Sequence, residues 1–372
     1  MYTEEVLRFK QEDLKEFVIE YFKKLGVPQD HSSIVADVML EADLRGIPSH
    51  GLMRINMYYG VRLENGYMDP KTSYKVISES DTTSLIDGGN GLGHVVSVFA
   101  MNRAIEKAKK SNVAISVVKN SDHYGIAAYY SMMALQHNMI GISLSNSQPL
   151  VAPTYGKTPI LGTNPISIAC PSYKAYPFVL DMATSVVPSG KIQVYEKLKQ
   201  KLPHGWGINN EGVMTQEPED IKSGGCGALL PLGGDDITSG YKGYGLALVV
   251  DILCAVLSGA SVLSEVGFPD EPKHCDVSHF FMAINIEAFR PIIDFKKQMD
   301  HVVEILKNSP KAKGKDKIYI AGEKEFENAE KNKTLGIPLM MKVLNDLKKD
   351  GDRIGVPFTA RPVMMDVCSW YK

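Results

Sequence analysis

Two short histidine motifs in the first third of the chain contain residue types that carry acid–base chemistry. Ser49-His50-Gly51 precedes Arg54, and Asp122-His123-Tyr124-Gly125 forms the second motif. A histidine can exchange a proton with a substrate oxygen near neutral pH. An arginine can hold a carboxylate through two parallel hydrogen bonds. On spacing alone, a structural role at a helix start is the more common explanation for His50, and a capping role is equally consistent with His123.

Both motifs follow predicted secondary-structure elements. Apolar residues recur at helical spacing over residues 14–25 and 34–42, and the second of these helices runs directly toward Ser49-His50-Gly51. If the segment after Gly51 is helical too, His50 and Arg54 share one face. Residues 114–118 have strand character and end just before Asp122, so His123 lies where a strand gives way to a helix, a favoured place for active sites in α/β proteins.

Beyond about residue 80, short β-rich runs alternate with helical stretches at 95–110 and 127–137. The predicted strands cover residues 83–86, 114–118, 141–144, 166–169 and 178–180. This alternation predicts an α/β fold with a mixed sheet, preceded by a helical N-terminal segment. Residues 201–240 are rich in Gly, Pro and Asn and are expected to form long loops, whereas the apolar run 246–257 is expected to be a buried helix.

A glycine-rich stretch at residues 87–94 resembles a dinucleotide-binding loop, but its spacing fails. Gly89 and Gly91 fit the G-x-G-x-x-G pattern, whereas His94 occupies the third glycine position. The next strand also lacks the acidic residue that would bind a ribose. We therefore expect a tight turn here rather than an ordinary Rossmann fingerprint.

Two further segments offer groups that suit a cofactor phosphate. Leu180-Asp181-Met182-Ala183-Thr184-Ser185 ends a predicted strand and is expected to begin a helix, where free backbone N–H groups and two hydroxyls would be available. Lys242 lies at the start of the helix that follows Gly240. An ordinary N-terminal cap at the first position and a surface lysine at the second are equally consistent with the spacing.

Composition limits the classes of protein that the chain can belong to. The chain has 372 residues, long enough for two or three packed domains, and its formal net charge is −2. That charge provides no basic field for nucleic acid or an anionic membrane, so neither is an expected partner. The cysteines are scattered, which indicates reduced thiols and a cytoplasmic protein: Cys170, Cys226, Cys254, Cys275 and Cys368. His274, Cys275 and His279 lack a suitable fourth ligand, so no metal site is expected.

Taken together, these segments resemble the malate/L-lactate dehydrogenase family that is unrelated to the common Rossmann lactate and malate dehydrogenases. The resemblance runs from about residue 10 to about residue 340. The stretches that carry it, in order, are Ala42-Asp43-Leu44-Arg45-Gly46, Ser49-His50-Gly51, His123-Tyr124-Gly125, Gly162-Thr163-Asn164-Pro165, Leu180 to Ser185 with Gly190-Lys191, Gly205-Trp206, Leu230-Pro231-Leu232-Gly233, Lys242 to Leu246, and His279-Phe280-Phe281. One departure is Ala321-Gly322, where relatives have Pro-Gly.

The resemblance implies a role for each motif. It implies that His123 or His50 moves the proton, with His123 the first choice, and that Arg54, beside Ser49, faces the substrate carboxylate. It also implies a homodimer with the active site between domains. The cofactor-binding residues that it implies are Ser147, Val179, Leu180, Asp181, Met182, Ala183, Thr184, Ser185, Tyr241, Lys242, Gly322, Glu323 and Lys324.

The predicted function is that of an NAD(P)-dependent oxidoreductase that interconverts a 2-hydroxy acid and its 2-oxo acid, with malate as the leading small-molecule substrate. Other family substrates (lactate, sulfolactate, ureidoglycolate, diketogulonate or a cyclic imine) stay open, as does a non-catalytic metabolite-binding protein. Asp181 and the lack of a basic residue in the turn after it favour NAD, with NADP as the alternative. A second substrate carboxylate would need a clamp, for which Arg45, Lys119 and Asn120 are candidates.

The same resemblance suggests four regions along the chain. Residues 1–78 form an N-terminal helical segment that carries part of the active site, and residues 79–142 a catalytic α/β region. Residues 143–285 form the nicotinamide cofactor-binding domain, of mixed-sheet, non-Rossmann type. Residues 286–372 form a C-terminal region that returns to the core.

Overall fold

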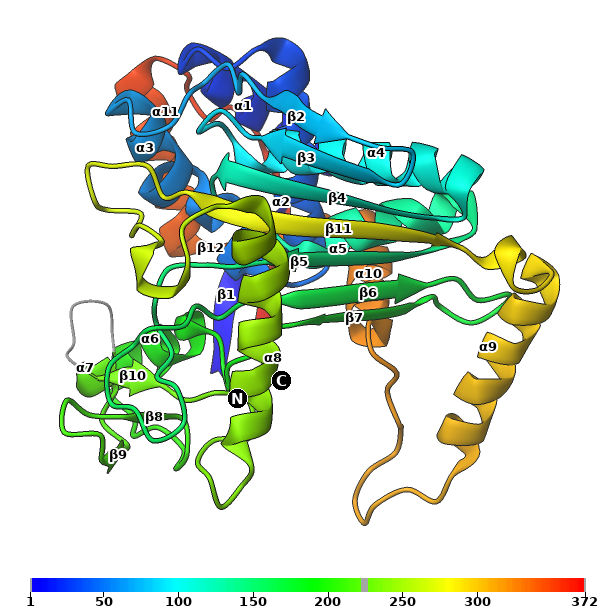
Figure 1. Cartoon of the computed structure of the whole chain (residues 1–372). Helices are drawn as coiled ribbons and strands as arrows, with labels where there is room; N and C mark the ends of the chain where they lie inside the picture. Colours follow the sequence, from blue (N-terminus) through cyan, green and yellow to red (C-terminus); the bar gives the residue numbers. More distant parts are fainter. Residues whose placement is uncertain (1, 222–226, 371–372) are drawn as a thin grey trace.

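The computed structural model describes residues 2–221 and 227–370, and its centre is a seven-stranded sheet (Figure 1). The strands run in the order β2-β3-β4-β11-β5-β6-β7. Their bounds are β2 Lys75–Glu79, β3 Thr83–Asp87, β4 Val113–Ser121, β5 Met139–Ser145, β6 Ile166–Cys170, β7 Phe178–Met182 and β11 Val277–Asn285. β3 and β4 are parallel and joined by helix α4 (Gly93–Ser111), whereas the other neighbouring strands are antiparallel. The expected mixed α/β fold is therefore confirmed.

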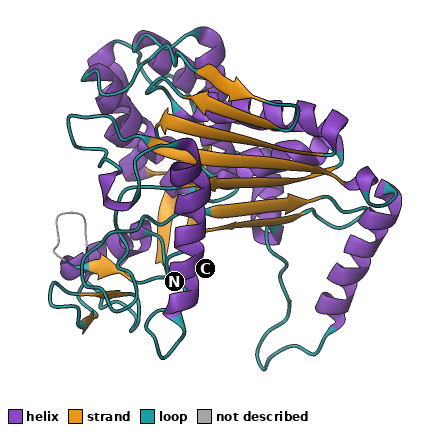
Figure 2. Ribbon diagram, viewed as in Figure 1, coloured by secondary structure: helices purple, strands orange, loops and turns teal. Residues whose placement is uncertain are grey.

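Helices cover both faces of this sheet (Figure 2). Alternate residues of a strand point to opposite faces, so Val117 and Phe280 pack toward the helix α8 (Gly240–Asp251), whose last turns continue as η5 (Ile252–Val256). Val118 and Phe281 pack on the other side, in the cluster formed with α4 and α5 (Ala127–Met133). The central strands are thus buried on both sides, in agreement with their apolar sequences.

The N-terminal helices α1 (Gln11–Lys24) and α2 (Gln29–Leu44) confirm the two helices expected from periodicity. They share one apolar core with the C-terminal helix α11 (Met341–Ile354). A second, three-stranded sheet lies beside them, in the order β12-β1-β13. Its strands are β1 Tyr2–Phe9, β12 Ile337–Met340 and β13 Pro362–Trp370, so the two ends of the chain pair with each other.

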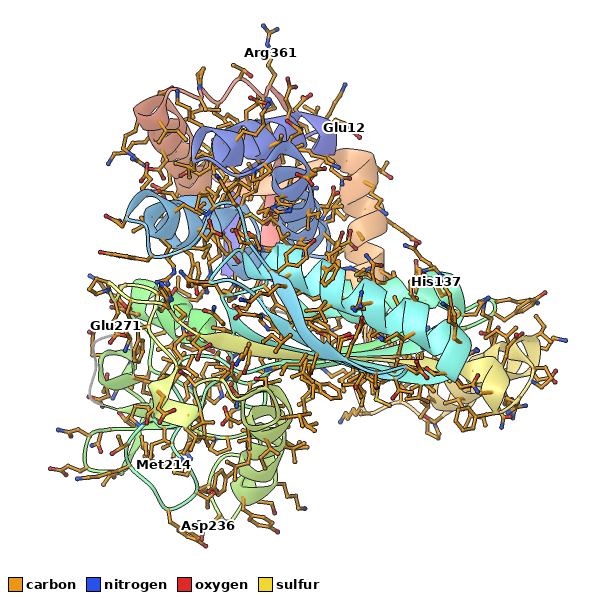
Figure 3. All side chains as sticks on the ribbon, turned by 45° about the horizontal axis from the view of Figure 1, so that its top comes forward. Glu12, His137, Met214, Asp236, Glu271 and Arg361 are labelled. Carbon is orange, nitrogen blue, oxygen red and sulfur yellow. The ribbon has the colours of Figure 1, made fainter. Side chains whose placement is uncertain are left out.

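A small lobe lies beside one end of the main sheet, and Met214 and Asp236 mark it in Figure 3. It contains a short sheet in the order β10-β8-β9 and packs around Leu161, Ile192 and Leu229. Its elements are α6 Ser189–Lys197, β8 Gly207–Ile208, β9 Met214–Thr215, α7 Pro218–Ile221 and β10 Ala228–Leu229. Most of the expected loop region 201–240 falls here. Cys226 lies outside the described residues.

The chain leaves the main sheet after β11 and forms a projecting arm (Figure 1). Helix α9 (Ile292–Asn308) has no buried residue, and a long segment returns from it to α10 (Glu323–Leu335). The remaining elements are short: η1 Pro48–His50, η2 Leu52–Arg54, η3 Ile55–Gly60, α3 Val61–Glu64, η4 Ala134–His137, η6 Leu263–Glu265 and η7 Ile286–Ala288. Among the described residues, no helix is both long and apolar enough to span a membrane.

The prediction of a buried helix at 246–257 is wrong in one respect. The segment is helical, but Val249, Ile252 and Val256 are each about half exposed. The reason is that one side of the helix packs on the sheet, while none of the described residues covers the other. The apolar composition of a helix does not reveal whether the same chain or another surface covers it.

Candidate active site

The first histidine motif lies in a short helical turn directly after α2. His50 and Arg54 belong to two separate 3₁₀ turns, η1 and η2, which are interrupted at Gly51. Ser49 holds both side chains: its hydroxyl lies 3.0 Å from Nδ1 of His50, and its carbonyl accepts a 2.8 Å hydrogen bond from Nε of Arg54. The two terminal nitrogens of Arg54 are therefore left for a carboxylate.

The interruption at Gly51 is stabilised by a buried carboxyl group. Asp43, near the end of α2, accepts a 2.8 Å hydrogen bond from the backbone N–H of Leu52. A Cβ atom at Gly51 would overlap that carboxyl group, so only glycine fits at this position without movement. Burial raises the pKa of Asp43 to about 8, against the lowering effect of the Leu52 N–H. Asp43 thus fixes the loop that carries His50 and Arg54.

The second motif lies between β4 and α5, and a buried ion pair holds it. The carboxylate of Asp122 accepts hydrogen bonds from Tyr58 (2.6 Å), from Nε of Arg62 (3.0 Å) and from the backbone N–H of His123 (2.7 Å). Arg62 is fully buried and also donates to the carbonyls of Pro269 and Lys273. The residues that follow Arg54 along the chain therefore hold the loop that presents His123.

The glycine-rich stretch 87–94 is the predicted tight turn, and it braces the same loop. The N–H of Gly88 donates to the carbonyl of Lys119 and the N–H of Asn90 to that of Asn120, each at 2.8 Å. The side chain of Asn120 donates to Asp87. The glycines therefore serve packing against the end of β4 and begin α4.

The structure brings the two histidine motifs together. The rings of His50 and His123 stack at a centroid separation of 5.4 Å. Both are half-buried, as are Ser49 and Arg54, so the four side chains line one partly open site. Burial, followed by the charge of Arg54, lowers the pKa of His50 to about 3. Burial, followed by His50, Arg54, His94 and His279, lowers the pKa of His123 well below its usual value.

These shifts leave both rings neutral at physiological pH. A neutral imidazole beside an arginine can bind an anionic acid and can take up a proton from its hydroxyl group. A carboxylate bound to Arg54 would offset the arginine charge and raise the pKa of both histidines. The arrangement can therefore couple the binding of an acid to proton transfer.

A cavity of about 300 Å³ lies beside the site, and some of the expected cofactor residues line it. Its lining includes Arg45, Ile47, Ala128, Val179, Leu180, Asp181, Gly322 and Lys324. Arg45 and Ile47 lead into the His50 turn, and Ala128 begins the helix after His123. Asp181 ties β7 to α5 by accepting a 2.8 Å hydrogen bond from the Ala128 N–H. The cavity is thus continuous in sequence with both histidine motifs.

The residues of the cavity fit a portion of a dinucleotide. Lys324 and Arg45 supply positive charge, and the exposed Asp181 side chain is suited to accept hydrogen bonds from ribose hydroxyls. Its volume is at the lower end of the range for small-molecule sites, about 300–1,000 Å³. Glu323 lies on the opposite side of the turn, where its carboxylate accepts hydrogen bonds from Lys307 (2.6 Å) and Ile320 (3.1 Å). This residue anchors the projecting arm.

The other expected cofactor residues form a separate group near the start of α8. The hydroxyl of Ser147 accepts from the N–H of Thr163, and the N–H and hydroxyl of Thr184 both donate to the carbonyl of Thr163. Tyr241 and Lys242 are exposed in the first turn of α8, as predicted for a helix start. This group lies outside the cavity that contains Asp181 and Lys324.

The prediction that a helix begins at residues 183–185 is wrong. β7 ends at Met182, the chain continues as a loop through Ala183, Thr184 and Ser185, and α6 begins only at Ser189. The hydroxyl of Thr184 donates to the carbonyls of Thr163 and Asn164, and that of Ser185 to the carbonyl of Val187. Because the backbone here pairs with neighbouring loops, it has no array of free N–H groups of the kind a helix start provides.

Of the candidates for a distal carboxylate clamp, Arg45 and Asn120 are engaged elsewhere. Nε of Arg45 donates to Glu41 at 2.6 Å, and its guanidinium lies 4.4 Å over the ring of Phe326. The amide of Asn120 bonds Asp87, and its backbone N–H bonds Asp276.

His279 is enclosed between the hydroxyls of Ser121 and Ser145, each 2.9 Å away. Within the described ranges, no cluster of three or more His, Cys, Asp or Glu side chains could hold a metal.

Several residues that shape the site escaped the sequence-based reasoning. Tyr58, Tyr59 and Arg62 form a contiguous layer beneath His123, and in the sequence they resemble an ordinary apolar helix. The signal that could have revealed them is Arg62, a charge within a run of otherwise core-type residues, because a buried charge requires a partner. Asp43 gave a similar signal at the end of α2.

Comparison with known proteins identifies the family. Residues 9–348 match the family described as malate/L-lactate dehydrogenase. The malate dehydrogenase of Pyrococcus abyssi is 47% identical over 355 residues, covering 95% of this chain and 96% of the relative. The L-sulfolactate dehydrogenase of Methanocaldococcus jannaschii is 40% identical and covers 93% and 97%.

Solved structures agree with the fold. The malate dehydrogenase of Pyrococcus horikoshii superposes with a TM-score of 0.87 at 45% identity, covering 94% of this chain and 96% of that one. The malate dehydrogenase of Entamoeba histolytica gives a TM-score of 0.90 at 36% identity, covering 95% and 99%. With a matching family model over most of its length and relatives above 40% identity, the chain belongs to the malate/L-lactate dehydrogenase family and is an oxidoreductase of that family.

Proposed function

We propose that this enzyme interconverts malate and oxaloacetate with a nicotinamide cofactor. The observation that carries the proposal is the placement of Arg54 beside two stacked histidines. Its Nε is held by the Ser49 carbonyl, and its charge lowers the pKa of both His50 and His123, so the guanidinium lies close to the two rings. A carboxylate on its terminal nitrogens would set the adjacent C2 oxygen beside an imidazole.

In this proposal, the chain's own residues bind, orient and move one proton. Arg54 binds the C1 carboxylate, and His123 donates a hydrogen bond to the C2 oxygen. His123 receives the hydroxyl proton when the acid is oxidised and returns a proton when the oxo acid is reduced. The nicotinamide supplies the hydride chemistry at C2 when it is bound. His50 lies against His123 and keeps one face of its ring free of water.

For the cofactor we propose NAD. Val179, Leu180, Asp181, Gly322 and Lys324 would hold one part of it in the cavity, with Met182 and Ala183 next along the chain. The carboxylate of Asp181 suits a ribose diol and would repel a 2′-phosphate. Arg45 already bonds Glu41, which leaves Lys324 as the cation for NADP. Comparing KM for NADH and NADPH tests this preference, and a strong preference for NADPH would overturn it.

We propose that the second group of expected residues faces the rest of the cofactor. Ser147, Thr184, Ser185, Tyr241 and Lys242 lie around the start of α8, where helix N–H groups and a lysine favour an anion. Replacement of Lys242 by Met should weaken NADH binding with little change in its fluorescence maximum. Replacement of Glu323 by Gln should loosen the projecting arm. It should weaken NADH binding less than the Lys242 change does, since the Glu323 carboxylate is already bonded to Lys307.

The substrate is tested by a reductase screen over oxaloacetate, pyruvate, 2-oxoglutarate, sulfopyruvate and a cyclic imine. The proposal expects oxaloacetate to exceed pyruvate in kcat/KM by roughly 2 kcal/mol or more, the contribution of a charged hydrogen bond. Equal efficiency on these two acids would contradict malate as the substrate. No oxidation of NADH with any of the acids would instead indicate a binding protein without turnover.

We propose a homodimer, formed through the uncovered side of α8 and η5. Leu246, Val249, Ile252, Val256 and Leu257 are between 39% and 59% exposed and recur at helical spacing. A second copy related by a two-fold axis would present the same stripe and cover it. Sedimentation should show a dimer, which Val249→Glu converts to monomer. Val213→Glu, equally exposed in the small lobe, should leave the dimer intact.

We also propose that the enzyme is cytoplasmic. Cys170, Cys254, Cys275 and Cys368 are free thiols, and two of them are buried in the core. Thiols of this kind are maintained in a reducing compartment. Cell fractionation would test the location.

A further inference from the structure

Tyr59 contacts the nitrogen of His123 that faces away from a substrate. Its hydroxyl lies 2.5 Å from Nδ1 of His123, and the tyrosine is completely buried. Tyr58 and Tyr59 are consecutive in the π-helical segment η3, and they contact the consecutive residues Asp122 and His123. Short π-helical turns occur frequently at functional sites, because the wider turn redirects side chains.

A second, longer contact favours one tautomer of the resting ring. The backbone N–H of Gly125 lies 3.3 Å from the same Nδ1. A backbone N–H can only donate, so this contact favours the neutral ring that has a lone pair on Nδ1 and its proton on Nε2. Gly125 has φ +81°, a conformation that brings its N–H to the ring and that glycine adopts readily. With Nδ1 engaged, Nε2 is the nitrogen that remains for a substrate.

The resting tautomer is suited to binding an oxo acid but not to the reverse reaction. Its Nε2–H can donate to a C2 carbonyl oxygen, yet it has no lone pair at Nε2 to accept a hydroxyl proton. Proton transfer at Nε2 needs Nδ1 to carry a hydrogen in both the imidazolium and the neutral ring that it leaves. That hydrogen requires an acceptor. The N–H of Gly125 cannot serve as one, whereas a hydroxyl can.

We propose that Tyr59 is a positioning residue for His123: its hydroxyl stays bonded to Nδ1 in every protonation state of the ring, by turning from donor to acceptor, and so keeps Nε2 as the nitrogen that exchanges the proton. This inference rests on the proposed function. At rest Tyr59 donates to Nδ1. Before reduction, the resting ring takes up a second proton from solvent, at Nδ1, and becomes imidazolium. During reduction, imidazolium His123 gives its Nε2 proton to the C2 oxygen as hydride arrives at C2, and Nδ1–H donates to Tyr59. After the transfer the ring is the neutral Nδ1–H tautomer, and solvent returns a proton to Nε2 for the next turnover. Oxidation reverses these transfers.

The other groups around His123 cannot take this role. The titratable and charged side chains that face it come from several elements. They are His50 of η1, Arg54 of η2, Tyr58 of η3, His94 of α4, Asp122 of the loop after β4, and His279 of β11. Tyr58 donates to Asp122, and both nitrogens of His279 are bonded to serines. The nitrogens of His94 have no hydrogen-bond partner. Tyr59 is thus the partner of Nδ1 that can both donate and accept.

The closing experiment compares wild type with Tyr59→Phe, which keeps the aromatic ring and removes the hydroxyl. Side-chain ¹⁵N NMR of the substrate-free protein reports the tautomer of His123, with His123→Gln identifying its signals. We expect wild type to show the Nε2–H tautomer alone. In Tyr59→Phe the longer 3.3 Å contact from the Gly125 N–H remains, so we expect the Nε2–H tautomer to stay the major form beside a detectable Nδ1–H fraction. This measurement does not depend on turnover. The tautomer of wild type can be tested even if Tyr59→Phe does not fold. A dominant Nδ1–H tautomer in wild type would overturn the proposal.

The pH dependence of kcat/KM supplies the second readout. In Tyr59→Phe the imidazolium loses its acceptor, so the His123 pKa should fall by about half to one unit, the difference between an ionic and a neutral hydrogen bond. The acidic limb for oxidation and the basic limb for reduction should both move to lower pH, and kcat should fall about 10- to 100-fold.

Tyr58→Phe is the matched control. It removes a neighbouring buried hydroxyl that bonds Asp122, so it should lower thermal stability without moving either limb. If Tyr59→Phe moves neither the limbs nor the tautomer, the positioning role is excluded. If wild type itself has no turnover while the tautomer is as expected, the proposed function fails instead.

Discussion

The imidazole rings of His50 and His123 stack with their planes inclined by only 24°, although they come from separate loops that different helices hold in place. Each ring is fixed by a neighbour on its outer edge, Ser49 for His50 and Tyr59 for His123. The pair therefore behaves as one unit, in which a change to one ring alters the surroundings of the other.

This contact leads to the first prediction, on turnover. His123→Gln should lower kcat by about 10²–10⁴-fold, the usual contribution of a general acid–base group. If the rings act together, His50→Ala with His123→Gln should cost no more than the worse single change, because effects within a catalytic unit are not additive. Steady-state kinetics measure this, and NADH fluorescence titration should show unchanged cofactor affinity. Near-normal turnover of His123→Gln would show that another group moves the proton.

The second prediction concerns substrate binding. Arg54→Met removes the nitrogens left free by the Ser49 carbonyl and should lower kcat/KM for oxaloacetate by about 100-fold, since hydrogen bonds to a carboxylate are charge-assisted. Most of the change should appear in KM. Arg361→Met is the control, because Arg361 is exposed at the periphery of the molecule (Figure 3). An unchanged KM in Arg54→Met would place the carboxylate elsewhere.

The third prediction concerns stability. Arg62→Met leaves the Asp122 carboxylate buried without its charge partner and should lower the free energy of unfolding by about 3–5 kcal/mol. The exposed pair Arg353–Glu64 offers the comparison: Arg353→Met should cost about 1 kcal/mol or less. Urea denaturation distinguishes them. Combining Arg62→Met with Asp122→Asn should restore part of the loss, and a fully additive loss would argue that the two groups do not interact.

The fourth prediction is a pH dependence that arises from Asp43. Its pKa is raised to about 8 in the folded protein, so the folded state binds a proton that the unfolded chain releases near pH 4. Wild type therefore loses stability as pH rises between these values, by at most about 1.4 kcal/mol per unit from this group. Asp43→Asn keeps an acceptor for the Leu52 N–H and does not titrate.

The difference in melting temperature, variant minus wild type, should therefore grow from pH 5.5 to pH 8.5. Scanning calorimetry at three pH values measures it. A constant difference across this range would mean that Asp43 is ionised in the folded protein throughout.

Much of the fold follows from local sequence patterns. Strands β3 to β7 and helices α1, α2 and α4 were predicted because each has a periodic apolar pattern of sufficient length. β1 was not, because Tyr2–Phe9 is a mixed polar segment whose pairing partners are β12 and β13, more than 300 positions away. A strand stabilised only by distant partners leaves little local signal.

The residues of the candidate site also differ in whether the sequence alone could predict them. His50, His123 and Arg54 could be proposed from residue type and spacing, and in the fold the rings of His50 and His123 are in contact. Tyr59 could not, because its role depends on which atom of His123 it reaches. The failure at 183–185 has a related cause: the hydroxyls of Thr184 and Ser185 suited a helix start, but carbonyls from neighbouring loops took their hydrogen bonds.

The position of β11 has a consequence for how the chain is made. This strand, residues 277–285, lies between β4 and β5, and both of those strands leave the ribosome long before it does. Until β11 arrives, their inner edges carry unpaired backbone groups and an apolar surface, conditions that slow folding and favour aggregation. A chain interrupted before β11 would therefore contain every residue of both histidine motifs, yet it could not assemble the sheet that sets them face to face.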